Sequence, residues 1–151
     1  MQKKTYAGYI NLKPINGIIF PSYIQNQTFK NFINNELDGH FYMTTNENTY
    51  GENSIILKSL LCEKILSGIV FLSTFCLPED STERKKIYNL AKKNKKKFIF
   101  IFEKFNVDFK KKLDLNKIEE FILFDQEFFT NKKTFVNKNE HIFLDNEWKF
   151  I

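Results

Sequence analysis

Apolar residues in the middle of the chain form two runs that are separated by a helical pattern. Residues 68–74 are rich in β-branched and aromatic side chains and carry no charge, which is typical of a strand buried on both faces. Asp80, followed three residues later by Glu83, gives a capping-box pattern before a segment with apolar side chains three and four residues apart. Residues 97–103 form the second apolar run. This order predicts a βαβ unit whose ligand site would lie beyond the carboxyl ends of its parallel strands.

The flanking parts of the chain continue this alternation of short apolar runs and amphipathic segments. The predicted strands outside the central unit are residues 5–12, 17–20, 40–44 and 122–124. The predicted helices outside it begin at Ser22 and at residue 53, and the second runs to residue 66. Such alternation predicts an α/β fold: a single three-layer domain with a mostly parallel sheet of four or five strands, flavodoxin-like or recombinase-like in order, and helices on both faces.

The length of the chain, 151 residues, is that of one domain. We assign residues 1–130 to the α/β domain. Residues 131–151 alternate polar and apolar side chains, which predicts a C-terminal hairpin or edge strand that extends the same domain. An edge of this kind is also a candidate surface for a homo-oligomer.

The composition indicates a folded, cytoplasmic protein. Aromatic residues make up 17% of the chain, which argues against disorder. No apolar run approaches the roughly 20 residues of a membrane-spanning helix, and the first residues are polar, unlike a signal peptide. We therefore expect no membrane partner.

The sequence predicts neither a metal site nor a cofactor. His40 and His141 lack the spacing of metal ligands. Cys62 and Cys76 fall in a predicted buried helix and strand, which favours two reduced structural thiols over a disulfide or a metal pair. The chain contains no Gly-rich phosphate-binding loop.

The net charge of +5 is made up in a way that argues against nucleic-acid recognition. Arg84 is the single arginine among 23 basic residues, and the others are lysines. Proteins that read bases or grip phosphates usually keep several arginines for bidentate contacts, so we expect no nucleic-acid partner. The lysine-rich residues 92–97 are most simply the solvated end of a helix, where positive charge complements the helix dipole.

Short motifs that resemble one protein family are spread over about residues 6–105. They are GYI at 8–10, Gly17, Pro21, Gln25-Asn26, Asn46-Glu47, Tyr50, GIVFLSTFCLPED at 68–80, Arg84, Tyr88 and FIFE at 100–103. With these residues the chain resembles the sporadic carbohydrate cluster proteins, small proteins encoded among bacterial genes for surface polysaccharides and unusual sugars. The resemblance implies a role in carbohydrate biosynthesis and brings no established reaction with it.

A second resemblance, in the order of elements, is to the catalytic domain of serine recombinases. Residues 11–13 stand where the nucleophilic serine of that family would lie, and none of them is a serine. The family's cluster of activating arginines is reduced to Arg84, and no helix-turn-helix pattern follows. This resemblance therefore implies an α/β fold and no recombinase activity.

Two acidic residues that follow predicted strands are candidates for general acid/base catalysis. Glu47 lies in the loop after the strand at 40–44, and Glu103 ends the strand at 97–103. Parallel strands end at one edge of a sheet, so both carboxylates could act on a sugar if they converge with Arg84, with Tyr50 as a secondary proton donor. The alternatives are a helix-cap or loop carboxylate for Glu47 and an ordinary strand-end charge for Glu103.

Arg84 is the first candidate for substrate binding. It is the one arginine in a chain whose other basic residues are lysines. The geometry of a guanidinium group suits a clamp for a phosphate or carboxylate. The alternative is a structural ion pair with Glu83, Glu79 or Glu47.

Three polar residues are further candidates for substrate binding. Gln25 and Asn26 would donate to or accept from sugar hydroxyls, or else satisfy the backbone of the loop after Pro21. Ser73 lies near a strand end without the turn of a nucleophile elbow, so we expect it to contact substrate and not to attack it.

These residues lead to two hypotheses of function from different classes. The first is a protein that acts on or binds a small anionic carbohydrate, a sugar phosphate or nucleotide sugar. The second is a non-catalytic partner of a carbohydrate-biosynthesis enzyme, for which the aromatic segment at 135–151 would form an oligomerisation edge. Whether the protein is an enzyme stays open at the level of the sequence.

Overall fold

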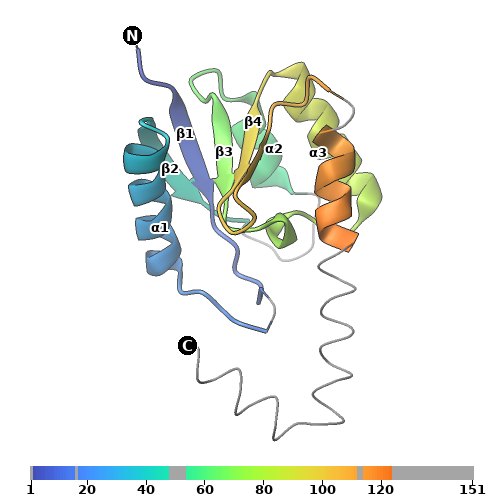
Figure 1. Cartoon of the computed structure of the whole chain (residues 1–151), viewed down its shortest axis with the longest axis horizontal. Coiled ribbons are helices and arrows are strands. Elements are labelled where there is room, and N and C mark those ends of the chain that lie inside the picture. The colour runs from blue at the N-terminus through green and yellow to red at the C-terminus, as the bar shows by residue number, and fades with distance from the viewer. Residues whose placement is uncertain (1, 16, 48–53, 112–113, 124–151) are drawn as a thin grey trace, which may run out of the picture. The chain divides into compact units, whose positions relative to one another are not determined.

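The structure, a computed structural model, describes residues 2–15, 17–47, 54–111 and 114–123 (Figure 1). The chain divides into two compact units, Met1–Lys117 and Ile118–Ile151. The sheet and the labelled helices belong to the first unit. The hairpin or edge strand predicted at residues 131–151 lies outside the described residues.

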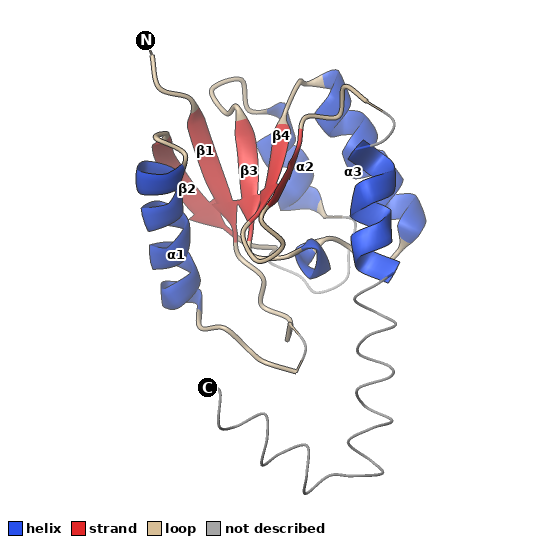
Figure 2. Cartoon of the chain, viewed as in Figure 1, coloured by secondary structure: helices blue, strands red, loops and turns tan. Residues whose placement is uncertain are grey.

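A five-stranded sheet forms the centre of the first unit, with the strand order β2-β1-β3-β4-β5 (Figure 2). The strands are β1 (Thr5–Tyr9), β2 (His40–Thr45), β3 (Gly68–Phe71), β4 (Lys97–Phe100) and β5 (Phe105–Val107). The first four are parallel, and β5 is antiparallel to β4. The predicted mostly parallel sheet is therefore confirmed, and β1 to β4 follow the flavodoxin-like order.

Helices cover both faces of this sheet, so the predicted three-layer α/β fold is confirmed (Figure 1). Helix α1 (Ser22–Asn31) packs on β1 and β2, and α2 (Ile55–Cys62) packs on β3 and α3 (Ser81–Lys93). The chain moves from β1 to β2 in one direction and from β2 to β3 and β4 in the other. Right-handed crossovers consequently place α1 on one face and the other two helices on the opposite face.

Aromatic side chains fill the core around Phe71 of β3. Its ring stacks on Phe100 at 5.3 Å between centroids, meets the edge of Phe98 at 4.9 Å, and lies 5.6 Å from the ring of Tyr9. All four side chains are buried. Phe29 of α1 is fully buried as well, and so is Ile33, which lies in a π-helical turn, η1 (Phe32–Glu36).

The two central strands are shorter than predicted. β3 ends at Phe71 and is followed by a 3-10 turn, η2 (Thr74–Cys76), in place of a strand to residue 74. β4 ends at Phe100, because the chain turns over residues 101–104 and returns as β5, a strand that the sequence analysis did not predict. The turn places Lys104 at a φ of +52°.

The helix predicted at residues 53–66 is also shorter, since α2 runs from Ile55 to Cys62. The ammonium group of the buried Lys96 donates to the carbonyl oxygens of Glu63 and Leu66. These two carbonyls are therefore paired although neither residue lies in a helix. Ile65, which the prediction placed inside this helix, lies beyond its end and is 57% exposed. Cys62, predicted to be buried, is exposed, and both cysteines are free thiols.

Two of the weaker strand predictions are wrong. Residues 114–123 are helical, so no parallel strand begins at residue 122. The candidate strand at 17–20 is reduced to one isolated bridge between Ile15 and Ile18. Within the described residues, no helix is long and apolar enough to cross a membrane.

Gly8 allows α1 to lie directly on β1. A Cβ atom at this position would lie 2.5 Å from Cδ2 of Phe29, well inside van der Waals contact. The backbone pairing of β1 with β2 also shifts register between Tyr6 and Gly8. The glycine in the GYI motif is therefore explained by packing between the sheet and the helix layer.

Gly8→Ala should lower the free energy of unfolding by about 1–3 kcal/mol, because the added methyl group overpacks this contact. Phe29→Leu in the same chain should recover part of that loss, since the smaller side chain leaves room for the methyl group. Urea denaturation of the two single variants and the double variant measures the coupling. If the losses in unfolding free energy of the two single variants simply add in the double variant, the contact between residue 8 and Phe29 is contradicted.

Candidate site at the carboxyl edge of the sheet

The candidate site lies at the edge where β1 to β4 end. Chain connections leave β1 toward β2 on one side and reach β3 on the other, so the order of the sheet reverses between β1 and β3. Parallel α/β sheets bind ligands at such a switch point, beyond the carboxyl ends of their strands. Polar residues follow each of these strands: Asn11 follows β1, Glu47 follows β2, Ser73 follows β3 and Glu103 follows β4.

Glu47 caps the start of α2. Its Oε2 accepts a hydrogen bond from the amide of Ile56 at 3.0 Å, and its Oε1 accepts one from the amide of Leu57 at 2.9 Å. Ser54, the residue before α2, has a φ of +46° and provides no side-chain cap of its own. A carboxylate is well suited to these unpaired amides and to the positive end of the helix dipole. The geometry of Glu47 is therefore that of the helix-cap alternative.

Tyr9, which the sequence analysis did not single out, completes the surroundings of Glu47. Its hydroxyl donates to Oε1 of Glu47 at 2.9 Å. Burial raises the pKa of Tyr9 well above its ordinary value, and the charge and hydrogen bond of Glu47 raise it further. The phenol consequently stays protonated and acts as a fixed donor. In the sequence it belongs to the GYI motif and lies inside the strand predicted at residues 5–12, which gives no sign of this contact.

Glu103 reaches the same edge from the turn between β4 and β5. Its Oε1 accepts hydrogen bonds from the hydroxyl of Ser73 at 2.5 Å, the amide of Thr74 at 3.1 Å and the hydroxyl of Thr74 at 3.2 Å. Its Oε2 is buried and accepts no hydrogen bond from any residue that the structure describes. Glu103 thus holds the β3 loop with one oxygen and keeps a second acceptor buried.

Cys76 lies beside this carboxylate and is unsuited to act as a nucleophile. Burial raises the pKa of its thiol to about 12, and the charge of Glu103 contributes to the rise, although backbone hydrogen bonds at Ser73 and Leu72 oppose it. A thiol with such a pKa remains protonated at neutral pH and is unreactive.

Gln25 is committed to the backbone of the loop after β1. It is 1% exposed, and its Oε1 accepts from the amide of Asn11 at 2.9 Å. Its Nε2 donates to the carbonyls of Asn11 at 2.6 Å and Phe20 at 2.8 Å. Asn26 accepts a hydrogen bond from the hydroxyl of Thr44 at 2.8 Å and so ties α1 to β2. Gln25 therefore has the backbone contacts of the structural alternative, whereas Asn26 contacts the side chain of Thr44.

Arg84 lies in the first turn of α3 and is 6% exposed. Its Nη1 donates to the carbonyls of Pro78 at 3.0 Å and Glu79 at 2.6 Å, which fixes the guanidinium against the loop before the helix. Two of the three carboxylates expected to pair with it have partners of their own, since Glu47 caps α2 and Glu83 forms ion pairs with Lys58 and Lys86. The anion clamp stays a prediction.

The structure therefore brings together one group of the predicted residues. We define the edge cluster as Tyr9, Glu47, Ser73, Thr74, Cys76 and Glu103. The hydroxyl of Tyr9 joins Glu47 in one half of it, and the hydroxyls of Ser73 and Thr74 join Glu103 in the other, where the amide of Cys76 donates to the carbonyl of Ser73 at 3.0 Å. Neither Glu47 nor Glu103 pairs with Arg84 in the described part of the chain, and the predicted proton donor Tyr50 lies outside it.

Comparison with known proteins adds no family to this description. No model of a protein family matches the chain, and no curated protein matches it significantly. The two resemblances drawn from its motifs stay predictions. Among the described residues, no group of three or more His, Cys, Asp and Glu side chains is placed to hold a metal ion.

Glu47→Ala should lower the free energy of unfolding by about 1–3 kcal/mol, because it leaves the Ile56 and Leu57 amides and the Tyr9 hydroxyl without their acceptor. Glu36→Ala is the control, since Glu36 is exposed, and should change it by less than about 0.5 kcal/mol. Urea denaturation monitored by circular dichroism compares them. A Glu47→Ala protein as stable as the control variant would rule out the capping role.

The Cys76 thiol predicts a loss of stability at high pH. The unfolded thiol has a pKa of 9.0 and the folded one a pKa of about 12, so between these values the unfolded chain releases a proton that the folded chain keeps. The contribution is present below about pH 9 and is lost as the pH rises toward 12. Above about pH 9, the unfolding free energy of the wild type should fall more steeply than that of Cys76→Ala, and Cys62→Ala should follow the wild type. Parallel curves for all three proteins would contradict the assignment.

Proposed function

We propose that the protein binds a small anionic sugar, a sugar phosphate or nucleotide sugar, at the carboxyl edge of its sheet. We further propose that it serves bacterial surface-carbohydrate or unusual-sugar biosynthesis in the cytoplasm. The process is suggested by the motifs that resemble the sporadic carbohydrate cluster proteins. The position is supported by the switch point between β1 and β3 and by the edge cluster that lies there.

The observation that carries the proposal is the buried Oε2 of Glu103. A buried carboxylate oxygen without a donor is unfavourable, because it has lost its hydrogen bonds to water. The hydroxyl groups of a sugar are donors of the kind that such an oxygen binds. Ser73 and Thr74 hold the other oxygen of the carboxylate, so the acceptor is oriented before a ligand arrives.

Arg84 is the group that we propose for the anionic part of the ligand. The start of α3 itself is a weaker candidate, because Asp80 already caps it by accepting hydrogen bonds from the amides of Thr82 and Glu83. The carbonyls of Pro78 and Glu79 fix the direction of the Arg84 guanidinium. A planar guanidinium that is held in this way suits a phosphate better than a mobile lysine would.

The geometry favours binding over acid/base catalysis by Glu47. Both oxygens of Glu47 accept hydrogen bonds from backbone amides, and one also accepts from Tyr9. A carboxylate engaged in this way has little capacity to take a proton from a substrate. We therefore assign Glu47 to the scaffold of the site and Glu103 to ligand contact. The alternative of a non-catalytic protein partner rests on residues 135–151, which lie outside the described residues.

Ligand binding should raise the melting temperature of the wild type in the presence of a sugar phosphate or nucleotide sugar, and inorganic phosphate or the neutral sugar should raise it less. Glu103→Gln should weaken binding about tenfold or more, because an amide nitrogen in place of Oε2 cannot accept a hydrogen bond. Arg84→Lys should also weaken it, by about 1–3 kcal/mol, through loss of the fork geometry.

Glu63→Gln is the control for this comparison, since Glu63 is an exposed carboxylate after α2, at the opposite edge of the sheet, and should bind as the wild type does. Calorimetry on folded protein separates binding from stability. No thermal shift with any member of a panel of sugar phosphates and nucleotide sugars would overturn the proposal. So would unchanged affinity in Glu103→Gln.

A further inference from the structure

The opposite edge of the sheet is lined by lysines from four neighbouring strands. Lys3 and Lys4 precede β1, Lys64 precedes β3 and Lys95 precedes β4, while Lys110 and Lys111 follow β5. Because β5 is antiparallel to β4, its end lies at the edge where the other strands begin. All six lysines are exposed. We call these six residues the basic edge.

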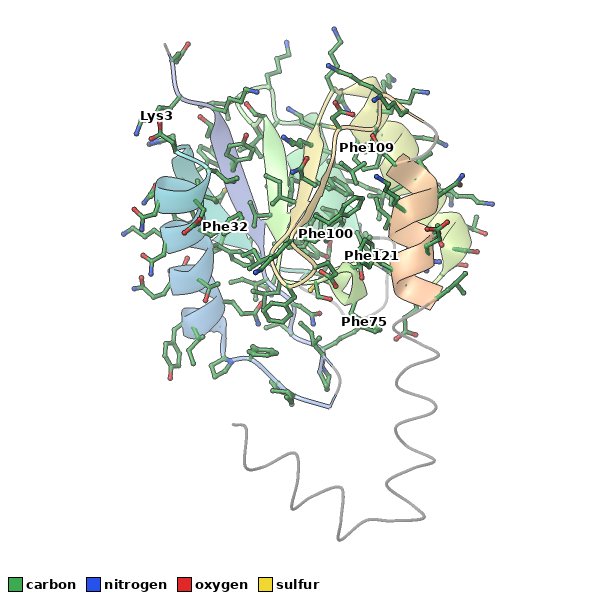
Figure 3. The ribbon with its side chains drawn as sticks, in the orientation of Figure 1. Lys3, Phe32, Phe75, Phe100, Phe109 and Phe121 are labelled. Atoms are coloured by element: carbon green, nitrogen blue, oxygen red, sulfur yellow. The ribbon has the colours of Figure 1, made fainter. Side chains whose placement is uncertain are left out.

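The sheet arranges these charges in a row. The strands β1, β3, β4 and β5 are consecutive neighbours in the sheet, and neighbouring strands lie about 4.8 Å apart, so the row extends over about 14 Å. Figure 3 labels Lys3 at this end of the sheet and shows further long side chains with nitrogen tips beside it. The last turn of α3 adds Lys92 and Lys93.

Few carboxylates offset this charge. Asp38 forms an ion pair with Lys3 at 2.8 Å, and Asp108 accepts a hydrogen bond from the amide of Lys110. Asp114 donates its amide to the carbonyl of Lys111, and Glu63 lies beside Lys64. Positive charge therefore exceeds negative charge along the basic edge. A row of this kind attracts a chain of negative charges, and the attraction weakens as salt is added.

The backbone at Lys95 adopts the left-handed conformation. Lys95 has a φ of +56° at the end of α3, where the amide of Lys96 donates to the carbonyl of Ala91 at 2.8 Å. Glycine usually occupies this position after a helix, because a side chain is strained there. Lys104, at the other edge of the sheet, has a similar φ of +52°, so the two lysines form a matched pair for comparing the edges.

We infer that the basic edge binds an anionic polysaccharide, a flexible chain of sugar rings that carry carboxylates. Sugar rings that are linked end to end and carry one carboxylate each present a row of negative charges, which is complementary to a row of lysines. Lysine ammonium groups bind such carboxylates as point charges. This surface is separate from the carboxyl edge and does not depend on the ligand proposed there.

The chemistry of the edge favours a polysaccharide over a nucleic acid. All of its basic residues are lysines, so it lacks the guanidinium forks that hold phosphates in a bidentate manner. The aromatic rings nearest to it along the strands, Tyr6, Phe98 and Phe109, are buried and offer bases no surface to stack on. The exposed ring beside these lysines is the imidazole of His40, whose amide donates to the carbonyl of Lys4. Duplex DNA also carries a charge for about every 1.7 Å of its axis, a denser array than this row matches.

The test measures binding of the full chain to alginate, a polyuronate, by fluorescence anisotropy at low and at raised salt. The wild type should bind at low salt and lose about tenfold or more in affinity when the salt concentration rises fourfold. Replacing Lys64, Lys95 and Lys110 together by Gln should reduce affinity about tenfold at low salt. Replacing Lys13, Lys85 and Lys104, three exposed lysines away from this edge, by Gln should leave it within about twofold.

A matched pair of single variants separates binding from stability. Lys104, in the turn after β4, has a φ of +52°, close to the +56° of Lys95, and lies at the other edge. Lys95→Gly and Lys104→Gly should both raise the melting temperature, by about 2–4 °C. Only Lys95→Gly should weaken alginate binding, by about two- to fourfold.

Three results would overturn the inference. The first is no alginate binding at low salt, and the second is equal loss of affinity in the variants of both edges. The third is binding to a mixed-sequence DNA duplex, or to phosphatidylglycerol vesicles, that is as tight as binding to alginate at the same salt. That result would assign the edge to a nucleic acid or to a membrane surface.

Discussion

Backbone groups in the loops at the carboxyl edge depend on side chains from distant parts of the chain. The amides at the start of α2 are capped by Glu47, the amide of Thr74 by Glu103, and the loop after β1 by Gln25. Buried amides and carbonyls must be paired within the protein, because water cannot reach them. These three side chains therefore determine the course of the loops, and with it the shape of any site that the loops form.

Because the loops depend on these hydrogen bonds, several polar residues at the carboxyl edge have a structural role. Glu47 and Gln25 have few free lone pairs or donors, so they are better suited to hold a site than to recognise a ligand. Glu103 differs, because it caps the β3 loop with one oxygen and keeps the other buried without a donor in the described part of the chain. One side chain thus connects the scaffold to the proposed ligand, and the lysines at the opposite edge form a separate electrostatic surface.

The sequence predicted the helices and strands whose cause lies within a few consecutive residues. Uninterrupted apolar runs identified β3 and β4, and the Asp80 cap identified the start of α3. β5 was not predicted, because it has only three residues. The turn before it has Lys104 at a positive φ, where a glycine would have indicated a turn. The residue that caps α2 was not predicted with certainty either, since Glu47 and the amides it binds lie in segments that only the fold brings together. Tyr9 became significant only when its hydroxyl was found on Glu47.

The central claim is that a sugar hydroxyl reaches Glu103. The amide of Thr74 is the most direct reporter of that contact, because it donates to the same carboxylate. The most direct measurement is a nuclear magnetic resonance titration of isotope-labelled protein with a panel of sugar phosphates and nucleotide sugars. If a ligand binds there, the Thr74 amide signal should shift in a saturable manner in the wild type, and in Glu103→Gln it should shift only at a ligand concentration about tenfold or more higher. If the Thr74 signal does not move with any member of the panel, or moves equally in Glu103→Gln, the carboxyl edge is not a sugar-binding site of this kind.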